Sequence, residues 1–353
     1  MEIYIINLLS IFIYWMIYKL FTGKLGDSKA LLNAFMCLIA VQLILLVGLR
    51  AEQIGIDTQS YAIRFGRYKE YSLTQIFRDT FQEKGFSLLI KVIGFLTDNF
   101  QWFAFFVAVL SVVPTIYVIR KFSSEPFLSI ILYIVFDYYA STFSLMRQVL
   151  AYNICMIGYL FIRKRKFVWF VITVLIAAQF HESAYIFLPA YFLGRVKINK
   201  TTIFVTLLTV AVVLRFNNQI GSFIIEHIFT EYALVKTGAG GWLAMCFLIT
   251  LFGLLIYPEV KSKRGNDIDG LYMFLFVGMI FMMFSNITQN AMRIANYYYA
   301  YVILFIPEVL YAVRKKRLLV FFEYIIVTAS LLMYVYFLRL DEYGIIPYIP
   351  FWQ

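Results

Sequence analysis

The stretch LLNAFMCLIAVQLILLVGLRAEQIGID, residues 31–57, joins a long apolar run to a polar segment that begins at Arg50. The apolar part, residues 31–49, is long enough to cross a bilayer core of about 30 Å as a helix. The whole chain has this character: 62% of its residues are hydrophobic and 14% are charged, with a mean hydropathy of +0.80. A soluble domain is about 25% charged, so the sequence predicts an all-α polytopic membrane protein.

Similar apolar runs recur along the chain, and no polar interval is long enough for a separate soluble domain. We therefore expect residues 1–353 to form a single integral membrane domain with about 11–13 transmembrane helices. The predicted spans lie near residues 3–21, 31–49, 101–119, 127–144, 146–162, 167–181, 201–216, 242–257, 271–288, 295–313 and 318–338. Two runs are ambiguous: residues 85–97 carry Lys91 at mid-length, which favours a re-entrant or interfacial helix, and residues 183–194 contain Pro189.

Basic residues concentrate in alternate short connections, and the positive-inside rule uses this pattern to set the orientation. The connections assigned to the cytoplasm contain 19 of the 31 Lys and Arg residues. This assignment gives about twelve crossings if residues 183–194 cross the membrane and residues 85–97 do not. Both termini and the extracytoplasmic loops at 50–100 and 217–241 then face outward. The net charge of +11 is therefore an orientation signal and does not indicate a nucleic-acid partner.

Several Arg residues lie at outward ends of the spans, where the positive-inside rule does not favour them. A charge inside a bilayer costs about 2.5–3.5 kcal/mol on insertion scales, so such a residue needs a partner or a function. The planar guanidinium fits phosphate oxygens two at a time, and we expect Arg147, Arg293 and Arg50 to bind a large anion. The alternatives are snorkelling to lipid head groups for Arg147 and an ion pair with Asp57 for Arg50. Arg215 lacks a motif and is not assigned to the site.

Two residues are candidates for a general base. An unperturbed His titrates near ~6.5 and accepts a proton around neutral pH, which makes His181 the first candidate. Asp57 is the second, although pairing with Arg50 is its simpler use. Glu182 follows His181 directly and is the weaker candidate of this pair.

Amide and tyrosine side chains near the outward face suit sugars, because amides both donate and accept and aromatic faces cover C–H surfaces. We expect sugar contacts from Tyr61, Gln148, Gln289 and Tyr297. Tyr297 lies four residues after Arg293 and shares its helical face. An interfacial aromatic belt is the alternative for this tyrosine-rich segment.

The sequence has no nucleotide-binding fingerprint, no zinc-protease motif and no serine nucleophile elbow. Its three Cys residues lie far apart inside apolar runs, without metal-ligand spacing. These residues give no indication of a bound metal or cofactor. A group transferred outside the cytoplasm must then come from a donor that is already activated there, such as a lipid diphosphate.

The same residues carry a resemblance to a family. The chain resembles the EpsG-type, Wzy-like bacterial polysaccharide polymerases over most of its length. The resemblance rests on five motifs, listed in chain order: Arg50 with Gly55, Asp57 and Tyr61; Glu83 with Gly85 and Leu89; Leu145 with Arg147 and Gln148; Phe180 with His181, Ser183 and Ala184; and Arg293 with Tyr297 and Pro307. In the fourth motif Glu182 occupies a freely varying position.

The resemblance implies a helical fold similar to C-type membrane glycosyltransferases, with an outward-facing cavity. It also implies that the protein joins undecaprenyl-diphosphate-linked oligosaccharide units into a capsular, exopolysaccharide or O-antigen chain. The site would face outward from the bacterial plasma membrane, in contact with membrane lipids. A chain-length regulator and other polysaccharide-assembly proteins are the implied partners. The alternatives are a flippase or transporter of lipid-linked oligosaccharide and a related ligase or acyltransferase.

Overall fold

The computed structural model describes residues 1–26, 28–79, 82–227, 240–285, 287–313 and 317–353. The regular secondary structure of these residues is helical, and they form no sheet apart from one isolated bridge between Arg50 and Pro350. The predicted all-α membrane class is confirmed, because five helices within these ranges are long and apolar enough to cross a bilayer. Those segments are Glu2–Gly23, Lys29–Gly48, Phe100–Phe122, Lys200–Phe223 and Tyr257–Met282. The exact number of crossings stays a prediction.

The chain forms two compact units. The first comprises Met1–Ile157, Ile172–Glu182 and Phe321–Gln353, and the second comprises Gly158–Val171 and Ser183–Val320. The helices of the first unit are α1 (Glu2–Leu25), α2 (Lys29–Gly48), α3 (Thr58–Tyr68), α4 (Leu73–Arg78), α5 (Lys84–Gly94), α6 (Phe100–Phe122), α7 (Pro126–Val135), the 3₁₀ helix η1 (Ala140–Phe143) and most of α17 (Arg317–Leu340). Like α17, helices α8 (Met146–Arg163) and α9 (Phe167–Ala178) contribute residues to both units.

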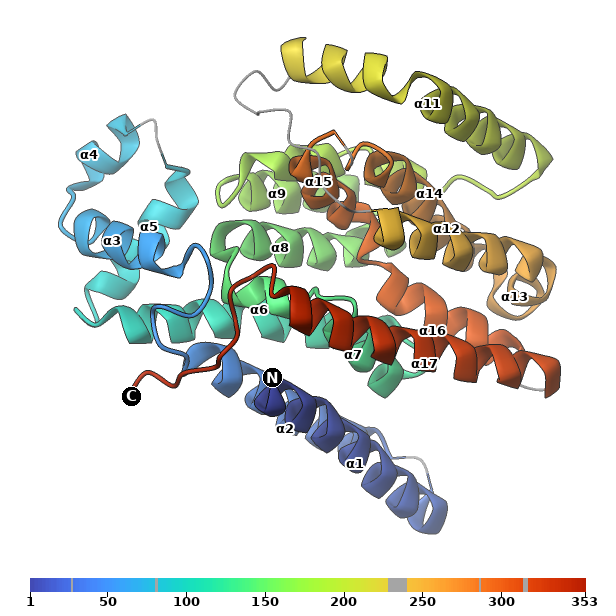
Figure 1. Ribbon diagram of the computed structural model, residues 1–353, viewed down its shortest axis with the longest axis horizontal. Coiled ribbons are helices and arrows are strands. Elements are labelled where there is room, and N and C mark those ends of the chain that lie inside the picture. Colours follow the sequence, from blue (N-terminus) through green and yellow to red (C-terminus); the bar gives the residue numbers. More distant parts are fainter. Residues whose placement is uncertain (27, 80–81, 228–239, 286, 314–316) are drawn as a thin grey trace. The chain divides into compact units, whose positions relative to one another are not determined.

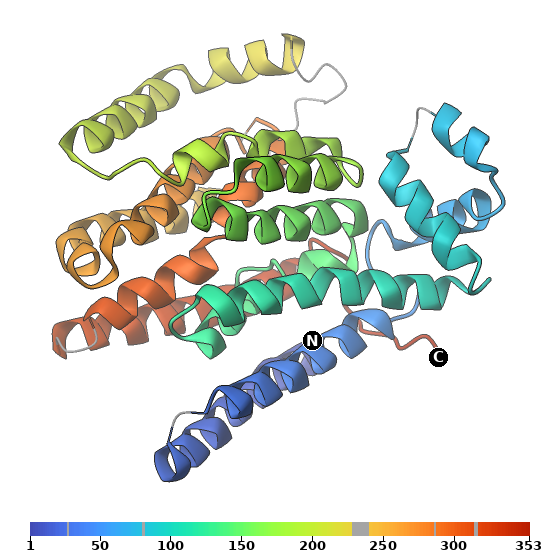
Figure 2. The same cartoon turned by 180° about the vertical axis from the view of Figure 1, so that it is seen from behind.

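Helices α2 and α6 lie side by side in both ribbon views (Figures 1 and 2). Gly48 makes this approach possible, because a Cβ at this position would lie 2.6 Å from the Phe105 ring. The Gln101 side chain in the first turn of α6 donates to the Gly48 carbonyl, which the end of α2 leaves without a helical partner. The Asn99 side chain caps the start of α6 by accepting from the Gln101 amide at 2.8 Å.

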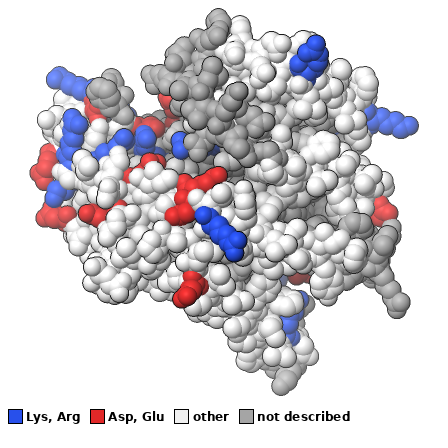
Figure 3. Space-filling model, viewed as in Figure 1, with Lys and Arg blue, Asp and Glu red and all other residues white. Residues whose placement is uncertain are grey.

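Residues 50–100 contain three short helices, α3, α4 and α5, that gather beside the first turns of α6 (Figure 1). Ser72 and Gln75 form a reciprocal capping box that starts α4. With 11 residues, α5 is about 16 Å long, too short to cross a 30 Å core. Charged side chains gather over this end of the molecule, whereas much of the rest of the same face is uncharged (Figure 3).

The predicted span at residues 127–144 is interrupted. Helix α7 ends at Val135, and the chain turns at Asp137, whose φ of 65° is left-handed. Asp tolerates this conformation better than most residues. The turn is closed by a hydrogen bond of 3.0 Å from the Tyr139 amide to the Tyr133 carbonyl, and η1 follows it. An apolar run predicts burial but does not show where the backbone bends within it.

The second unit contains η2 (Glu182–Phe187), α10 (Ala190–Leu193), α11 (Lys200–His227), α12 (Gly240–Leu255), α13 (Tyr257–Arg264), η3 (Gly265–Ile268), α14 (Asp269–Met282), α15 (Gln289–Tyr299) and α16 (Val302–Val313). Helices α14 and α15 pack closely because Gly278 has no side chain; a Cβ there would meet the Tyr299 amide at 2.8 Å. The span predicted at 295–313 is divided between α15 and α16. Here Tyr301 donates to the Tyr298 carbonyl in a tight turn.

Candidate functional site

Arg147, at the start of α8, forms an ion pair with Glu83, at the N-terminal boundary of α5. The distance from Arg147 Nη1 to Glu83 Oε2 is 2.5 Å, and the two side chains are 23% and 18% exposed. Both residues belong to the first unit. The residue that sequence analysis predicted to bind an anion therefore already has a carboxylate partner.

Tyr61, on α3, lies beside the same guanidinium. Its side chain is 5% exposed. Burial raises the pKa of the Tyr61 phenol, while the neighbouring Arg147 acts in the opposite direction. The phenol is therefore neutral at physiological pH and able to donate a hydrogen bond. We call Arg147, Glu83 and Tyr61 the Arg147 cluster.

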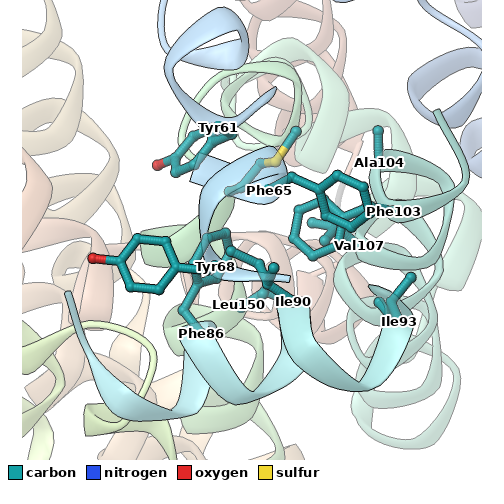
Figure 4. Close-up of a cluster of buried hydrophobic side chains, with 11 residues drawn as sticks. Tyr61, Phe65, Tyr68, Phe86, Ile90, Ile93, Phe103, Ala104, Val107 and Leu150 are labelled. Carbon is teal, nitrogen blue, oxygen red and sulfur yellow. The ribbon is translucent and has the colours of Figure 1, made fainter. Parts of the chain in front are cut away.

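A group of buried apolar side chains holds the Arg147 cluster in place. It joins α3, α5, α6 and α8 and is centred on Phe65, Phe86 and Phe103, with Phe65 and Phe103 ring centroids 5.1 Å apart. Tyr61 packs against Phe86 at 5.5 Å. In Figure 4 the Tyr61 and Tyr68 hydroxyls point away from the apolar members, on one side of the group. The rings are thus buried while the hydroxyls are presented at its edge.

The segment that carries His181 packs on the start of α5. The Phe86 amide donates to the Gln179 carbonyl at 3.3 Å, and a Cβ on Gly85 would lie 2.6 Å from the Gln179 side chain. Phe180 also packs against the apolar group beneath the Arg147 cluster. Three of the sequence motifs therefore lie close together in the first unit. They are the motif of Glu83 and Gly85, the motif of Arg147, and the segment that leads to His181.

Asp57 lies one helical turn before Tyr61, at the N-terminal boundary of α3. Its amide donates to the Ser144 hydroxyl at 3.2 Å, which ties this turn to the residues preceding α8. The Asp57 charge is close enough to oppose ionisation of Tyr61. The second candidate base thus lies near the Arg147 cluster.

The expected ion pair between Arg50 and Asp57 does not form. The Arg50 side chain is 2% exposed and donates instead to the carbonyls of Val47 at 2.5 Å, Phe143 at 2.9 Å and Ile54 at 3.3 Å. Burial lowers its pKa to about 10, so it remains protonated at neutral pH. Backbone carbonyls satisfy this cation, and its predicted diphosphate-binding role stays a prediction that its burial does not favour.

Backbone hydrogen bonds join the turn after Arg50 to the end of the chain. The Gly55 amide donates to Gly344 at 2.8 Å, and the Ala51 amide donates to Ile349 at 2.8 Å. Gly55 has a φ of +97°, and a Cβ there would lie 2.2 Å from the Phe143 carbonyl. Only glycine fits this turn, which leads directly into the helix that carries Tyr61.

The fifth sequence motif, which begins at Arg293, lies in the second unit. Arg293 is partly exposed on α15, whereas Tyr297 is 2% exposed and its hydroxyl lies 3.0 Å from that of Ser183. The side chain of Gln289 lies outside the described residues. Buried Asn296 Oδ1 has no hydrogen-bond partner among the described residues.

The described side chains that were predicted to contact a sugar are enclosed by protein. Tyr61, Gln148 and Tyr297 are each at most 5% exposed, so none presents an open face to a sugar in this conformation. Their sugar-binding roles stay predictions. Sequence reasoning gave Glu83 no role within its motif, and it did not single out Gln82 or Arg64. No local signal links any of these to Arg147, because the contacts depend on how α3, α5 and α8 pack.

The chain matches a known protein family over most of its length. The model of the EpsG family matches residues 33–349. The chain belongs to the EpsG family. The match includes all the motifs described above, and this EpsG family protein is a multi-pass membrane protein implicated in exopolysaccharide biosynthesis. No curated protein and no solved structure gives a match.

Within the part of this EpsG family chain that the structure describes, no three His, Cys, Asp or Glu side chains are grouped as metal ligands would be. The side chains of the Arg147 cluster and its surroundings offer cationic contacts to an anion, hydrogen-bond donation by a neutral phenol, and candidate proton acceptors in His181 and Asp57.

Proposed function

We propose that this EpsG family protein joins oligosaccharide repeat units, carried on undecaprenyl diphosphate, into a polysaccharide chain. The observation that carries the proposal is the convergence of Arg147, Tyr61 and the segment before His181 in one unit. A cation, a neutral donor and a candidate base in one region are what transfer from a lipid diphosphate requires.

In the proposed reaction, a hydroxyl oxygen of the incoming lipid-linked unit attacks the anomeric carbon at the reducing end of the growing chain. The bond between that carbon and the diphosphate oxygen breaks, and undecaprenyl diphosphate leaves with the electron pair. His181, or else Asp57, takes the proton of the attacking hydroxyl. In this proposal Arg147 stabilises the negative charge that develops on the leaving diphosphate. The same role for Arg293 rests on its sequence motif alone.

The orientation of the protein belongs to the same proposal. Alternate basic connections support a cytoplasmic assignment for one set of loops. Residues 50–100 then form an outward segment, with α5 as an interfacial or re-entrant helix, and the reaction occurs on the outer face of the plasma membrane. Arg50 is given a positioning role here, since its guanidinium holds the turn that leads into α3.

Reconstitution with defined substrates tests this function. The purified full-length protein is placed in lipid nanodiscs with undecaprenyl-diphosphate-linked repeat units, and products are separated on a gel. We expect a ladder of polymers spaced by one repeat unit. Release of single units onto a protein or lipid acceptor without a ladder would support a ligase instead. Movement of the units across liposome membranes without chain growth would support a flippase.

A further inference from the structure

A second bridge joins α3 to the start of α5, next to the Arg147 cluster. Arg64 Nη1 donates to Gln82 Oε1 at 2.5 Å. Arg64 lies three residues after Tyr61 and so shares its face of α3. Gln82 immediately precedes Glu83, the partner of Arg147. The Arg64–Gln82 and Arg147–Glu83 contacts are therefore neighbours within the first unit.

The chemistry of this bridge fixes the direction of the Gln82 amide. A guanidinium has five N–H donors and no acceptor, so the amide oxygen of Gln82 must face Arg64. The amide nitrogen then points away from Arg64. Gln82 is 4% exposed, and its Nε2 has no hydrogen-bond partner among the described residues.

Arg147 presents a second donor of the same kind. Its Nη1 is paired with Glu83, but its Nε is buried without a partner among the described residues. Buried donors without acceptors are unfavourable and uncommon in native proteins. Two of them, one on Arg147 and one on the residue next to its partner Glu83, indicate a ligand rich in acceptors.

We propose that Gln82 is a further ligand of the substrate's diphosphate and that Arg64 is the positioning residue that aims its amide nitrogen. This inference rests on the proposed function. A diphosphate matches the available groups because its oxygens accept hydrogen bonds, and Gln82 Nε2 and Arg147 Nε are both donors. A sugar hydroxyl would also need an acceptor for its own proton, and Glu83 Oε2 and Gln82 Oε1 already accept from Arg147 and Arg64.

Binding of undecaprenyl diphosphate to the purified full-length protein in nanodiscs tests the role of Gln82. Gln82→Glu keeps an acceptor for Arg64 but presents an oxygen where the N–H was, so we expect binding to weaken about 10- to 100-fold. Gln82→Met removes the donor without adding charge and should weaken binding roughly 3- to 10-fold. Gln59→Glu, at an exposed position on α3, makes the same charge change and should leave binding unchanged.

The role of Arg64 is tested in the same assay. Arg64→Met frees the Gln82 amide to rotate, and we expect part of the affinity to be lost, whereas Arg64→Lys restores a donor and should recover it. Thermal unfolding is measured alongside. Variants whose stability falls while their affinity stays at the wild-type level would overturn the proposal in favour of a purely structural bridge.

Two further probes identify what is recognised. Undecaprenyl monophosphate and inorganic pyrophosphate separate the lipid from the diphosphate, and only diphosphate-containing probes should respond to Gln82→Glu. If Arg147→Lys weakens binding but both Gln82 variants bind as wild type does, the Gln82 proposal is wrong and the polymerase proposal is untouched. If the Gln82 variants lose binding but the wild type builds no polymer ladder, Gln82 is a diphosphate ligand in a protein of another activity.

Discussion

Arg147 and Glu83 lie far apart in the sequence, and their side chains meet at 2.5 Å where α8 and α5 begin. Both are partly buried, so loss of either partner leaves a poorly solvated charge and costs more than breaking a surface ion pair does. Among the residues that the structure describes, the pair also leaves Arg147 Nε without a hydrogen-bond partner. One residue can therefore hold the fold through Glu83 and still bind an anion.

The first prediction concerns the stability contributed by this pair. Glu83→Ala should lower the free energy of unfolding by about 1–3 kcal/mol, because Arg147 loses its partner in a partly buried place. Thermal unfolding in detergent measures the change. The control is Glu70→Ala, which removes a 76% exposed carboxylate that lies 3.8 Å from Lys69 and should cost less than about 1 kcal/mol. Equal losses of unfolding free energy in both variants would show that breaking the Arg147–Glu83 pair costs no more than breaking an exposed ion pair.

A second prediction contrasts two glycines in one segment. Gly55→Ala should destabilise the protein by about 2–4 kcal/mol, because the φ of +97° and the Phe143 carbonyl leave no place for a Cβ. Gly66→Ala, inside α3 with nothing within 4 Å of the added Cβ, should be neutral or stabilise by up to about 1 kcal/mol. Circular dichroism melting curves compare them. A tolerated Gly55→Ala would mean that the turn before α3 differs from the one described.

Arg50 supplies a third prediction, which separates a positioning role from ligand binding. Arg50→Met removes the donor to three carbonyls and should lower the free energy of unfolding by about 2–4 kcal/mol. Arg78→Met, at an exposed position at the end of α4, should change it by less than about 0.5 kcal/mol. If Arg50→Met retains wild-type stability but no longer binds undecaprenyl diphosphate, Arg50 is a ligand, as the sequence alone predicted.

Long apolar helices were the most predictable part of the fold. The predicted spans at 3–21 and 101–119 lie within α1 and α6, and the span at 31–49 runs one residue past the end of α2, since length and hydropathy are local properties. The breaks after Val135 and Tyr299 were not predicted, because one charged residue, Asp137, was read as part of an apolar run and apolar residues continue through the second break. Backbone conformation at Asp137 and packing around Tyr301 decide where those helices end.

The residues of the candidate site could be predicted from the sequence better than the contacts between them. Arg147 and His181 could be identified as charged or titratable residues at the ends of apolar runs. Glu83, Gln82 and Arg64 could not be connected to them, because each contact joins helices that only the folded chain brings together. The contacts of Arg50 were not predictable for a related reason: backbone carbonyls of a turn accept from its guanidinium, and a sequence pattern does not reveal them.

The fourth prediction tests the base. His181→Asn should slow chain growth by about 10²–10⁴-fold, the usual contribution of a positioned proton acceptor. Asp57→Asn in the same assay tests the second candidate. Glu182→Gln, at the exposed neighbouring position, is the matched control and should leave the rate near that of the wild type. A His181→Asn protein that builds polymer at the wild-type rate would remove His181 from the mechanism and would also argue against an acyltransferase.

The most direct test of the central claim compares Arg147→Lys with the wild type in the reconstituted ladder assay. A single ammonium cannot both pair with Glu83 and offer a planar fork to a diphosphate. We expect chain growth to fall by about 10²-fold, while Arg163→Lys, at the other end of α8 and paired with Asp267 at 2.5 Å, stays close to the wild type. Polymer of normal length and yield from Arg147→Lys would contradict the account.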